Sequence, residues 1–195
     1  MKEPAVVTVF CASSTQISKI YIEAAESLAQ HLVDEGYAIK YGGGAVGLMG
    51  ALANKVLSLN GKIHGVIPKF MVEVEWQHPH VQSMLVTETM HQRKQALVQN
   101  VSAVVALPGS SGTLEELAEV ISMKKLGLFS KPIIIVNTNN FYDPFVQLME
   151  KMANENFMKH EHLRAFSVVN DPREVCNIIA SSPEWPIDAP VNAAV

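Results

Sequence analysis

The chain has little cysteine, little charge and no long apolar run. Two cysteines, Cys11 and Cys176, among 195 residues are too few and too far apart for a disulfide framework or a CxxC motif. Charged residues make up 17% of the chain and the formal net charge is -4, with no long basic run. No window has transmembrane length, and the N-terminal apolar segment has only the length of a strand. We therefore expect a cytoplasmic protein that binds neither nucleic acid nor membrane.

Apolar residues make up 48% of the chain, which is typical of proteins whose β-sheet is covered on both faces. Short β-branched runs alternate with longer helical patterns, which predicts an α/β fold with a doubly wound parallel sheet of about seven strands. We expect one domain over 1–181 and a proline-rich tail over 182–195 that is a surface arm or disordered. The expected strands are 5–11, 37–41, 62–67, 84–87, 101–107, 133–136 and 167–169, and the expected helices are 19–35, 48–59, 89–100, 113–127, 144–156 and 172–180.

Three loops rich in glycine and serine follow three of these strands. They read "CASS" (11–14), "YGGGAVGLMG" (41–50) and "LPGSSGT" (107–113). Because all strand-to-helix loops of a parallel sheet lie at its carboxyl edge, we expect the three loops to meet there and form a ligand site.

The second loop spells G-x-G-x-x-G, the fingerprint of dinucleotide-binding proteins. The match follows the second strand and no acidic residue is placed for a ribose diol, so the sequence does not favour NAD. We expect Gly42–Gly44 to bring backbone amides close to a phosphate or sugar. Gly47 and Gly50 are expected to let the next helix pack closely on the sheet.

The third loop leads into two carboxylates, Glu115 and Glu116. Thr113 and Glu116 have the spacing of a capping box, in which each side chain bonds the other residue's amide. The amides from Gly109 to Thr113 can instead bind an anion at the helix N-terminus, with Glu115 or Glu116 facing the rest of the ligand. The spacing does not decide between these interpretations.

The segment "TMHQRKQAL" (89–97) places two cations on an apolar helix face. Met90, Arg93, Lys94 and Leu97 share one face at helical spacing. An Arg-Lys pair usually lies on a solvated face, but here uncompensated charge would be costly. We expect a carboxylate or a bound anion to neutralise the pair, and an encounter of Arg93 with Glu116 would make an active site.

The histidine pairs give no metal prediction. His78 with His80, and His160 with His162, have no third ligand at a characteristic spacing, so we expect surface histidines and no bound metal.

Five motifs resemble those of one known family in order and spacing. They are "YGGGAVGLMG", "GVIP", "MHQRK", "PGSSGTLEE" and "KLGLFSKP", and the resemblance covers roughly Val6 to Ala180. The family is that of the Lonely Guy (LOG) proteins, cytokinin-activating phosphoribohydrolases that are often labelled lysine decarboxylases. The resemblance implies a Rossmann-like homodimer, with no cofactor, that hydrolyses the N-glycosidic bond of an adenine-type nucleoside 5'-monophosphate to free base and ribose 5-phosphate.

The resemblance also implies roles for single residues. Arg93 and Glu116 match the catalytic pair, with the loop holding the 5'-phosphate and the carboxylate serving the ribose, where positive charge develops at the anomeric carbon. The residues with an implied substrate-binding role are Ser13, Gly42, Gly43, Gly44, Glu75, Met90, Lys94, Gly109, Ser110, Ser111, Gly112, Thr113, Glu115 and Ser122.

The chain departs from the family pattern at a few positions. Ser110 stands where the family has a second glycine, and it is strained if that position has a positive φ. Ala12 replaces a glycine, Ser122 a threonine and Lys125 a glutamine, which bears on substrate preference more than on the reaction. The alternative function is a non-catalytic nucleotide or molybdenum-cofactor carrier on the same fold, which needs an anion-binding loop but no carboxylate at the anomeric carbon.

Overall fold

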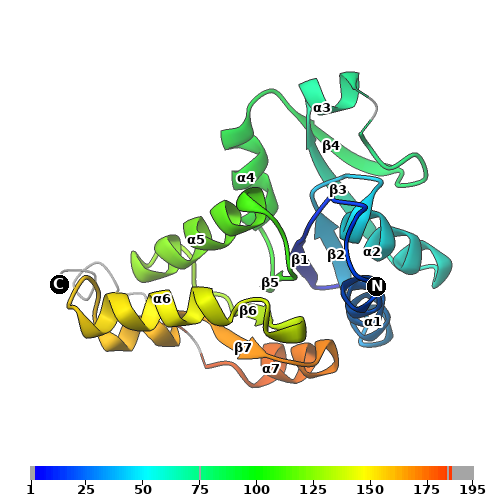
Figure 1. Ribbon diagram of the computed structural model, residues 1–195. Helices are drawn as coiled ribbons and strands as arrows, with labels where there is room; N and C mark the ends of the chain where they lie inside the picture. The colour runs from blue at the N-terminus through cyan, green and yellow to red at the C-terminus, as the bar shows by residue number, and fades with distance from the viewer. Residues whose placement is uncertain (1–2, 75, 184, 186–195) are drawn as a thin grey trace.

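The protein is built around a parallel β-sheet of seven strands (Figure 1). The computed structural model describes residues 3–74, 76–183 and 185. The order across the sheet is β4-β3-β2-β1-β5-β6-β7, and every neighbouring pair is parallel. The predicted doubly wound sheet is thus confirmed. The strands are β1 (Val6–Phe10), β2 (Ala38–Tyr41), β3 (Ile63–Pro68), β4 (Ser83–Thr87), β5 (Ala103–Ala106), β6 (Ile133–Val136) and β7 (Ser167–Val169).

Each predicted helix corresponds to an observed element, with ends that differ by a few residues. The short helix α3 and two 3₁₀ turns were not predicted, because elements of three to six residues are too short for a periodic pattern. The helices are α1 (Lys19–Asp34), α2 (Gly47–Ser58), α3 (Lys69–Glu73), α4 (Met90–Val98), α5 (Ser111–Lys125), α6 (Asp143–Asn154) and α7 (Val175–Ser181), and the 3₁₀ turns are Thr138–Asn140, His160–Ala165 and Pro172–Glu174.

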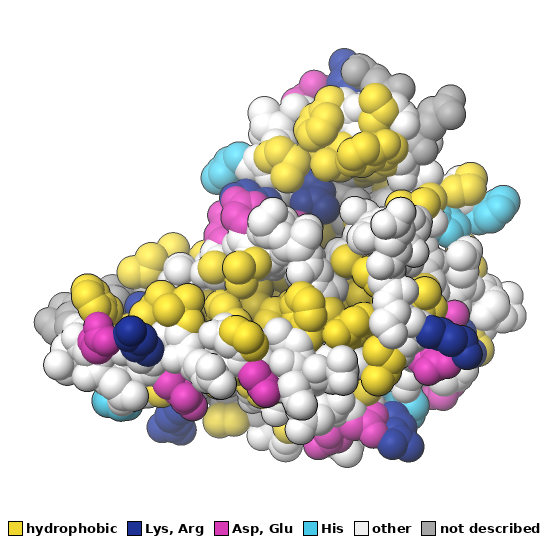
Figure 2. Space-filling model, viewed as in Figure 1, with side chains coloured by type: hydrophobic (Ala, Val, Ile, Leu, Met, Phe, Trp, Pro, Cys, Tyr) yellow, Lys and Arg dark blue, Asp and Glu magenta, His cyan; other side chains and the backbone are white. Residues whose placement is uncertain are grey.

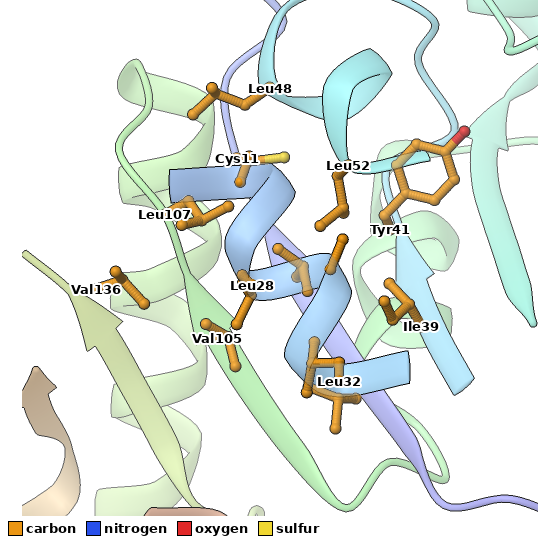
Figure 3. Close-up of a cluster of buried hydrophobic side chains, with 14 of the residues drawn as sticks. Cys11, Leu28, Leu32, Ile39, Tyr41, Leu48, Leu52, Val105, Leu107 and Val136 are labelled. Carbon is orange, nitrogen blue, oxygen red and sulfur yellow. The ribbon is translucent and has the colours of Figure 1, made fainter. Parts of the chain in front are cut away.

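Two apolar layers cover the two faces of the sheet. On one face, α1 and α2 pack over the central strands, and Leu28 and Leu32 of α1 meet Ile39, Val105 and Val136 (Figure 3). On the other face, α4, α5 and α6 build the second layer. Strand β1 serves both layers, since alternate side chains of a strand point to opposite faces. This burial on both faces explains the apolar composition.

The boundary of the C-terminal tail stays a prediction, because residues 184 and 186–195 lie outside the described part of the chain. Trp185 is described, and it packs against the second apolar layer. Among the described residues, no helix is both long and apolar enough to cross a membrane.

Candidate active site

The three glycine- and serine-rich loops meet at the carboxyl edge of the sheet, as predicted. Strand β1 lies between β2 and β5, so the chain leaves the sheet's centre in both directions there. Such a switch point opens a crevice outside the strand ends. A cavity of about 320 Å³ occupies it, and its lining residues are Ala12, Ser13, Ser14, Ile17, Tyr21, Leu48, Pro108, Gly109, Ser110 and Phe141.

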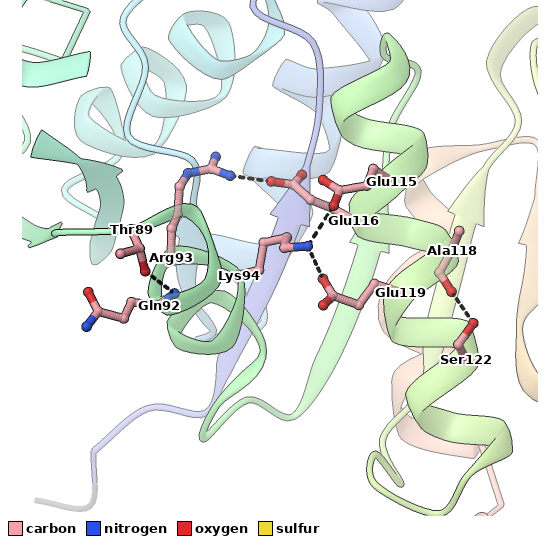
Figure 4. A network of polar contacts seen from close by, with 9 residues as sticks. All are labelled: Thr89, Gln92, Arg93, Lys94, Glu115, Glu116, Ala118, Glu119 and Ser122. Atoms are coloured by element: carbon pink, nitrogen blue, oxygen red, sulfur yellow. Dashed lines mark hydrogen bonds and ion pairs between the residues drawn. The ribbon is translucent and has the colours of Figure 1, made fainter. Parts of the chain in front are cut away.

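Beside this crevice, a buried ion pair joins α4 to α5 (Figure 4). Arg93 Nη1 donates to Glu116 Oε1 at 2.5 Å, and the two side chains are only 9% and 11% exposed. The structure therefore brings together the two residues predicted to form the catalytic pair. A charge-assisted hydrogen bond in a poorly solvated place holds both groups in a defined orientation.

Local geometry at the start of α4 directs Arg93 into the site. Thr89 caps the helix, because its hydroxyl accepts a hydrogen bond from the Gln92 amide at 3.2 Å. Gly42, at the end of β2, leaves room for the guanidinium. A Cβ at that position would lie 2.6 Å from Arg93 Nη2 and 2.9 Å from Met49 Sδ. The first glycine of the loop thus gives space to the arginine, a role that the sequence did not indicate.

The environment of Glu116 pulls its pKa in two directions. Burial raises the pKa of the carboxyl above its ordinary value, and the charges of Glu115 and Glu119 add to this increase. Arg93 lowers the pKa through its charge and its hydrogen bond, but burial dominates. Glu116 is therefore a carboxylate whose charge is poorly solvated and depends on Arg93 for stabilisation.

The guanidinium of Arg93 still has a free donor. Its Nε is buried and has no hydrogen-bond partner among the described residues. A buried donor without a partner is costly, so a ligand oxygen that accepts from it would be stabilised.

Lys94 forms a second, more exposed set of ion pairs. Its Nζ lies 2.6 Å from Glu115 Oε1 and 3.2 Å from Glu119 Oε2. The hydrogen bond that Lys94 donates to Glu115 is the main cause of the raised pKa of Lys94. The prediction that carboxylates neutralise the two cations is confirmed. Glu119 was missed, although its position four residues after Glu115 places both on one helix face.

The capping-box interpretation of Thr113 and Glu116 is wrong. Helix α5 begins two residues earlier than predicted, at Ser111, with Ser110 as its N-cap residue. Glu116 is thus the sixth residue of the helix, too far along to reach the cap, and it bonds Arg93 instead. Thr113 is buried, and its side chain packs against Gly109, where a Cβ would come within 2.1 Å of Oγ1.

The expected strain at Ser110 is also absent. Its φ is −88°, in the extended region that any residue adopts, so a glycine is not required there. The amide of Leu114 donates to the Ser110 carbonyl, which starts the helical ladder. The amides of Ser111, Gly112 and Thr113 precede that ladder and are available to an anion.

Gly47 and Gly50 were expected to let the next helix pack closely on the sheet, but their close contacts are with loop backbone. Gly47 has a φ of +62° and lies against the backbone of Ser13 and Ser14, where a Cβ would come within 2.5 Å. A Cβ on Gly50 would lie 2.2 Å from the Ala45 carbonyl oxygen. Close backbone contact therefore explains both residues.

The Gly43 and Gly44 backbone is tied to the segment after α3. Gly43, at a φ of +81°, accepts a hydrogen bond from the His78 amide at 2.9 Å, and Gly44 forms a bridge with Gln77. Whether this loop also approaches a ligand stays a prediction.

Among the described residues that were predicted to bind substrate, Ser13, Gly109 and Ser110 line the cavity and the others do not. Ser122 is exposed on α5, and its hydroxyl donates to the Ala118 carbonyl one turn earlier. Met90 is 38% exposed at the start of α4. Glu75 lies outside the described residues.

The expectation of surface histidines fails for one member of each pair. His78 is 4% exposed and its Nε2 lies 3.1 Å from Asn54 Oδ1, and His162 is 2% exposed. Within the described ranges, no group of three or more histidine, cysteine or acidic residues is arranged to hold a metal ion.

The cavity wall includes residues that the sequence did not single out. Tyr21 on α1 and Phe141 after the 3₁₀ turn Thr138–Asn140 form an edge-to-face pair with ring centroids 6.0 Å apart. They come from distant segments with no motif of their own, so only the fold brings them together.

The chain is similar to known proteins in both sequence and structure. The family model described as "Possible lysine decarboxylase" matches residues 49–179. A probable cytokinin riboside 5'-monophosphate phosphoribohydrolase of Oryza sativa subsp. japonica, LOGL1, is 39% identical over 153 residues, which cover 78% of this chain and 69% of the relative. The enzyme of that name from Rhodococcoides fascians is 37% identical over 156 residues, 80% of this chain and 79% of the relative.

Solved structures show the same fold at lower identity. The molybdenum cofactor binding protein of Rippkaea orientalis superposes with a TM-score of 0.69 at 21% identity, covering 93% of this chain and 98% of that one. The molybdenum cofactor carrier protein of Chlamydomonas reinhardtii gives 0.67 at 16% identity, covering 90% and 96%. At such identities the likeness concerns the fold alone. The match to the family model and the relatives with more than 30% identity place the chain in the Lonely Guy family of phosphoribohydrolase-like proteins.

Proposed function

We propose that this protein hydrolyses the N-glycosidic bond of a purine nucleoside 5'-monophosphate. Water adds to C1' of the ribose, the bond from C1' to the base nitrogen breaks, and the products are free base and ribose 5-phosphate. The observation that carries the proposal is the buried Arg93–Glu116 pair, which lies at the carboxyl edge of the sheet together with the loop 109–113 at the start of α5. The names of the relatives describe this reaction for cytokinin riboside 5'-monophosphates.

The loop 109–113 is the proposed site of the 5'-phosphate. Gly109 and Ser110 line the cavity, and the first amides of α5 precede the helical ladder. The positive end of the helix dipole favours a dianion at this position. Ser13, from the loop after β1, lines the same cavity.

Glu116 is the proposed catalytic carboxylate. Cleavage builds positive charge at the anomeric carbon, and a fixed negative charge in a poorly solvated place stabilises it more than in water. The same carboxylate can accept a proton from the attacking water. Both roles need the ionised form, which Arg93 favours against the effect of burial. Arg93 thereby orients the carboxylate and, through its unpaired Nε, offers a donor to the substrate.

The substrate class follows from the phosphate loop and from the relatives. We propose adenine-type nucleotides, with AMP and cytokinin riboside monophosphates as candidates. Incubation with AMP and with isopentenyladenosine monophosphate, followed by chromatography, should reveal free base. The matching nucleosides should be cleaved far more slowly, because binding energy from the remote phosphate contributes to catalysis. Equal rates with and without phosphate would contradict the proposed phosphate site.

The second candidate is a carrier that binds a nucleotide or molybdenum cofactor without cleaving it. The fold likeness to two molybdenum cofactor proteins favours it. The buried Glu116 argues against it, because a carboxylate near a bound anion weakens anion binding. An enzyme can use that negative charge in the reaction, whereas a carrier gains nothing from it. Recovery of AMP intact after prolonged incubation would support the carrier.

We also propose that two copies of the chain associate through an apolar surface beside the site. Strand β4 is an edge strand, and Figure 2 shows hydrophobic side chains gathered over α3 and β4. Large exposed apolar groups in one region mark interaction sites. A homodimer at micromolar concentration in sedimentation is expected, and a monomer would contradict this proposal. The exposed residues of this region are Phe70, Val74, Trp76, Leu85, Val86 and Met90.

A further inference from the structure

Two polar residues lie on the sheet face beneath α4, where apolar side chains are usual. Thr8 of β1 and Lys40 of β2 are direct partners in the parallel register. Their chain neighbours Val7, Val9 and Ile39 point to the opposite face and belong to the first apolar layer. Thr8 is fully buried and Lys40 is half-buried. This polar pair therefore requires an explanation other than packing.

Both side chains donate hydrogen bonds to the last turn of α4. Thr8 Oγ1 donates to the Leu97 carbonyl at 2.5 Å. Lys40 Nζ donates to the carbonyls of Ala96 and Gln99 at 3.0 and 2.8 Å. The last carbonyls of a helix have no partner within it, and a cation there also matches the helix dipole. The two strands thus supply a C-terminal cap from outside the helix.

Apolar contacts fix α4 only weakly. Its nine residues include just two buried ones, Arg93 and Leu97. Leu97 is its one fully buried apolar side chain and Ala96 and Val98 pack only partly against the second apolar layer, so apolar contacts contribute little to its position along its axis. Ion pairs of Arg93 and Lys94 with α5 hold its first turns, and the three hydrogen bonds to its carbonyls hold its last turn. These hydrogen bonds lie one turn, roughly 6 Å along the axis, beyond Arg93 and Lys94.

Burial of the Lys40 ammonium group costs free energy, because the charge loses part of its hydration. Burial lowers the pKa of Lys40, and no carboxylate of the described residues lies within ion-pair distance of it. His64, its partner on β3, carries no negative charge that could compensate the ammonium group. A half-buried cation whose partners are only carbonyls costs more than an apolar residue of the same length.

We propose that Thr8 and Lys40 are positioning residues that set the place of Arg93 for catalysis. By fixing the end of α4, they hold the guanidinium against Glu116. The inference rests on the proposed glycosidase function, because it assigns Arg93 to the reaction. A displacement near 1 Å at a catalytic group commonly costs about a hundredfold in rate.

The test uses isosteric variants. Lys40→Met removes the ammonium group and keeps the stem, and Thr8→Val removes the hydroxyl and keeps the shape. Each should lower kcat for AMP by tenfold or more, while the inhibition constant of inorganic phosphate stays within twofold, since loop 109–113 is untouched. Lys40→Arg and Thr8→Ser retain a donor and should recover most of the rate. Lys62→Met, the same change at an exposed lysine, should match the unmodified protein.

A readout independent of activity separates this inference from the proposed function. Hydrogen–deuterium exchange should accelerate in the peptide spanning Met90–Val98 for Lys40→Met and for Thr8→Val, but not for Lys62→Met. If the unmodified protein cleaves no nucleotide, the proposed function fails. Independently of activity, unchanged exchange of α4 in Lys40→Met and Thr8→Val overturns the proposal that these residues anchor the helix. If the unmodified protein is active, a kcat within twofold of normal in a folded Lys40→Met or Thr8→Val protein overturns the inference. Either variant decides the question if the other does not fold.

Discussion

Replacing Glu116 by glutamine isolates the charge of the proposed catalytic carboxylate. The amide has nearly the same size, and its oxygen can still accept the hydrogen bond from Arg93. What is lost is the negative charge and the basicity at a side chain that is 11% exposed. A capping role for this residue is already ruled out by the start of α5 at Ser111.

Two magnitudes follow for Glu116→Gln. Removing one preorganised electrostatic group from an active site typically costs about 2.7–4 kcal/mol, or 10²–10³ in turnover. For stability, a charge-assisted hydrogen bond becomes a neutral one, at a cost of about 1 kcal/mol. Because burial of the carboxylate disfavours its charge, the glutamine removes part of that cost. We therefore expect Tm to fall by no more than roughly 2–4 °C.

Steady-state release of adenine from AMP, thermal unfolding and AMP binding together form the assay. Glu119→Gln is the matched control, one turn further along α5, and its turnover at neutral pH should stay within threefold. A Glu116→Gln protein that keeps near-normal turnover would refute the reasoning. The catalytic carboxylate would then have to be Glu115 or Glu75.

Three further predictions concern the surroundings of the pair. Gly42→Ala should lower turnover at least tenfold in steady-state assays, because the added Cβ would meet Arg93 Nη2 at 2.6 Å; normal turnover would show that the guanidinium has room to move. Arg93→Ala should weaken AMP binding in calorimetry and lower Tm more than Glu116→Gln does, since a buried carboxylate left without its partner costs about 3–5 kcal/mol. As pH falls, the rate should begin to drop at a higher pH than expected for an ordinary glutamate. The reason is that Glu116, with its raised pKa, takes up a proton at a higher pH. Glu119→Gln removes a charge that raises this pKa, so a pH–rate profile should show the acid limb at lower pH, and an unmoved limb would mean that another group titrates.

The sequence predicts the sheet well because its short β-branched strands alternate with helices that are long enough to show a periodic pattern. The same holds for the meeting of Arg93 with Glu116, since both follow from helix faces and from the shared carboxyl edge. The start of α5 was misplaced, because Thr113 has the residue type and spacing of a cap. In the structure Ser110 is the N-cap residue, and Thr113 packs on Gly109 four residues earlier.

Other parts of the site leave no trace in a linear pattern. The space that Gly42 gives to Arg93 depends on how α4 crosses the end of β2, and the loop fingerprint suggested a ligand role instead. The hydrogen bonds of Thr8 and Lys40 to α4 join residues 56 to 89 positions apart. A polar residue inside an apolar strand is the only available indication of such a contact.

A single-turnover experiment with AMP tests the central claim most directly. With the protein in excess over AMP, quenched samples are separated to quantify AMP, adenine and ribose 5-phosphate. The account predicts that adenine and ribose 5-phosphate appear in equal amounts as AMP disappears, and that Glu116→Gln binds AMP but leaves it intact at least a hundredfold longer. AMP that is bound and recovered uncleaved from the unmodified protein would contradict the account.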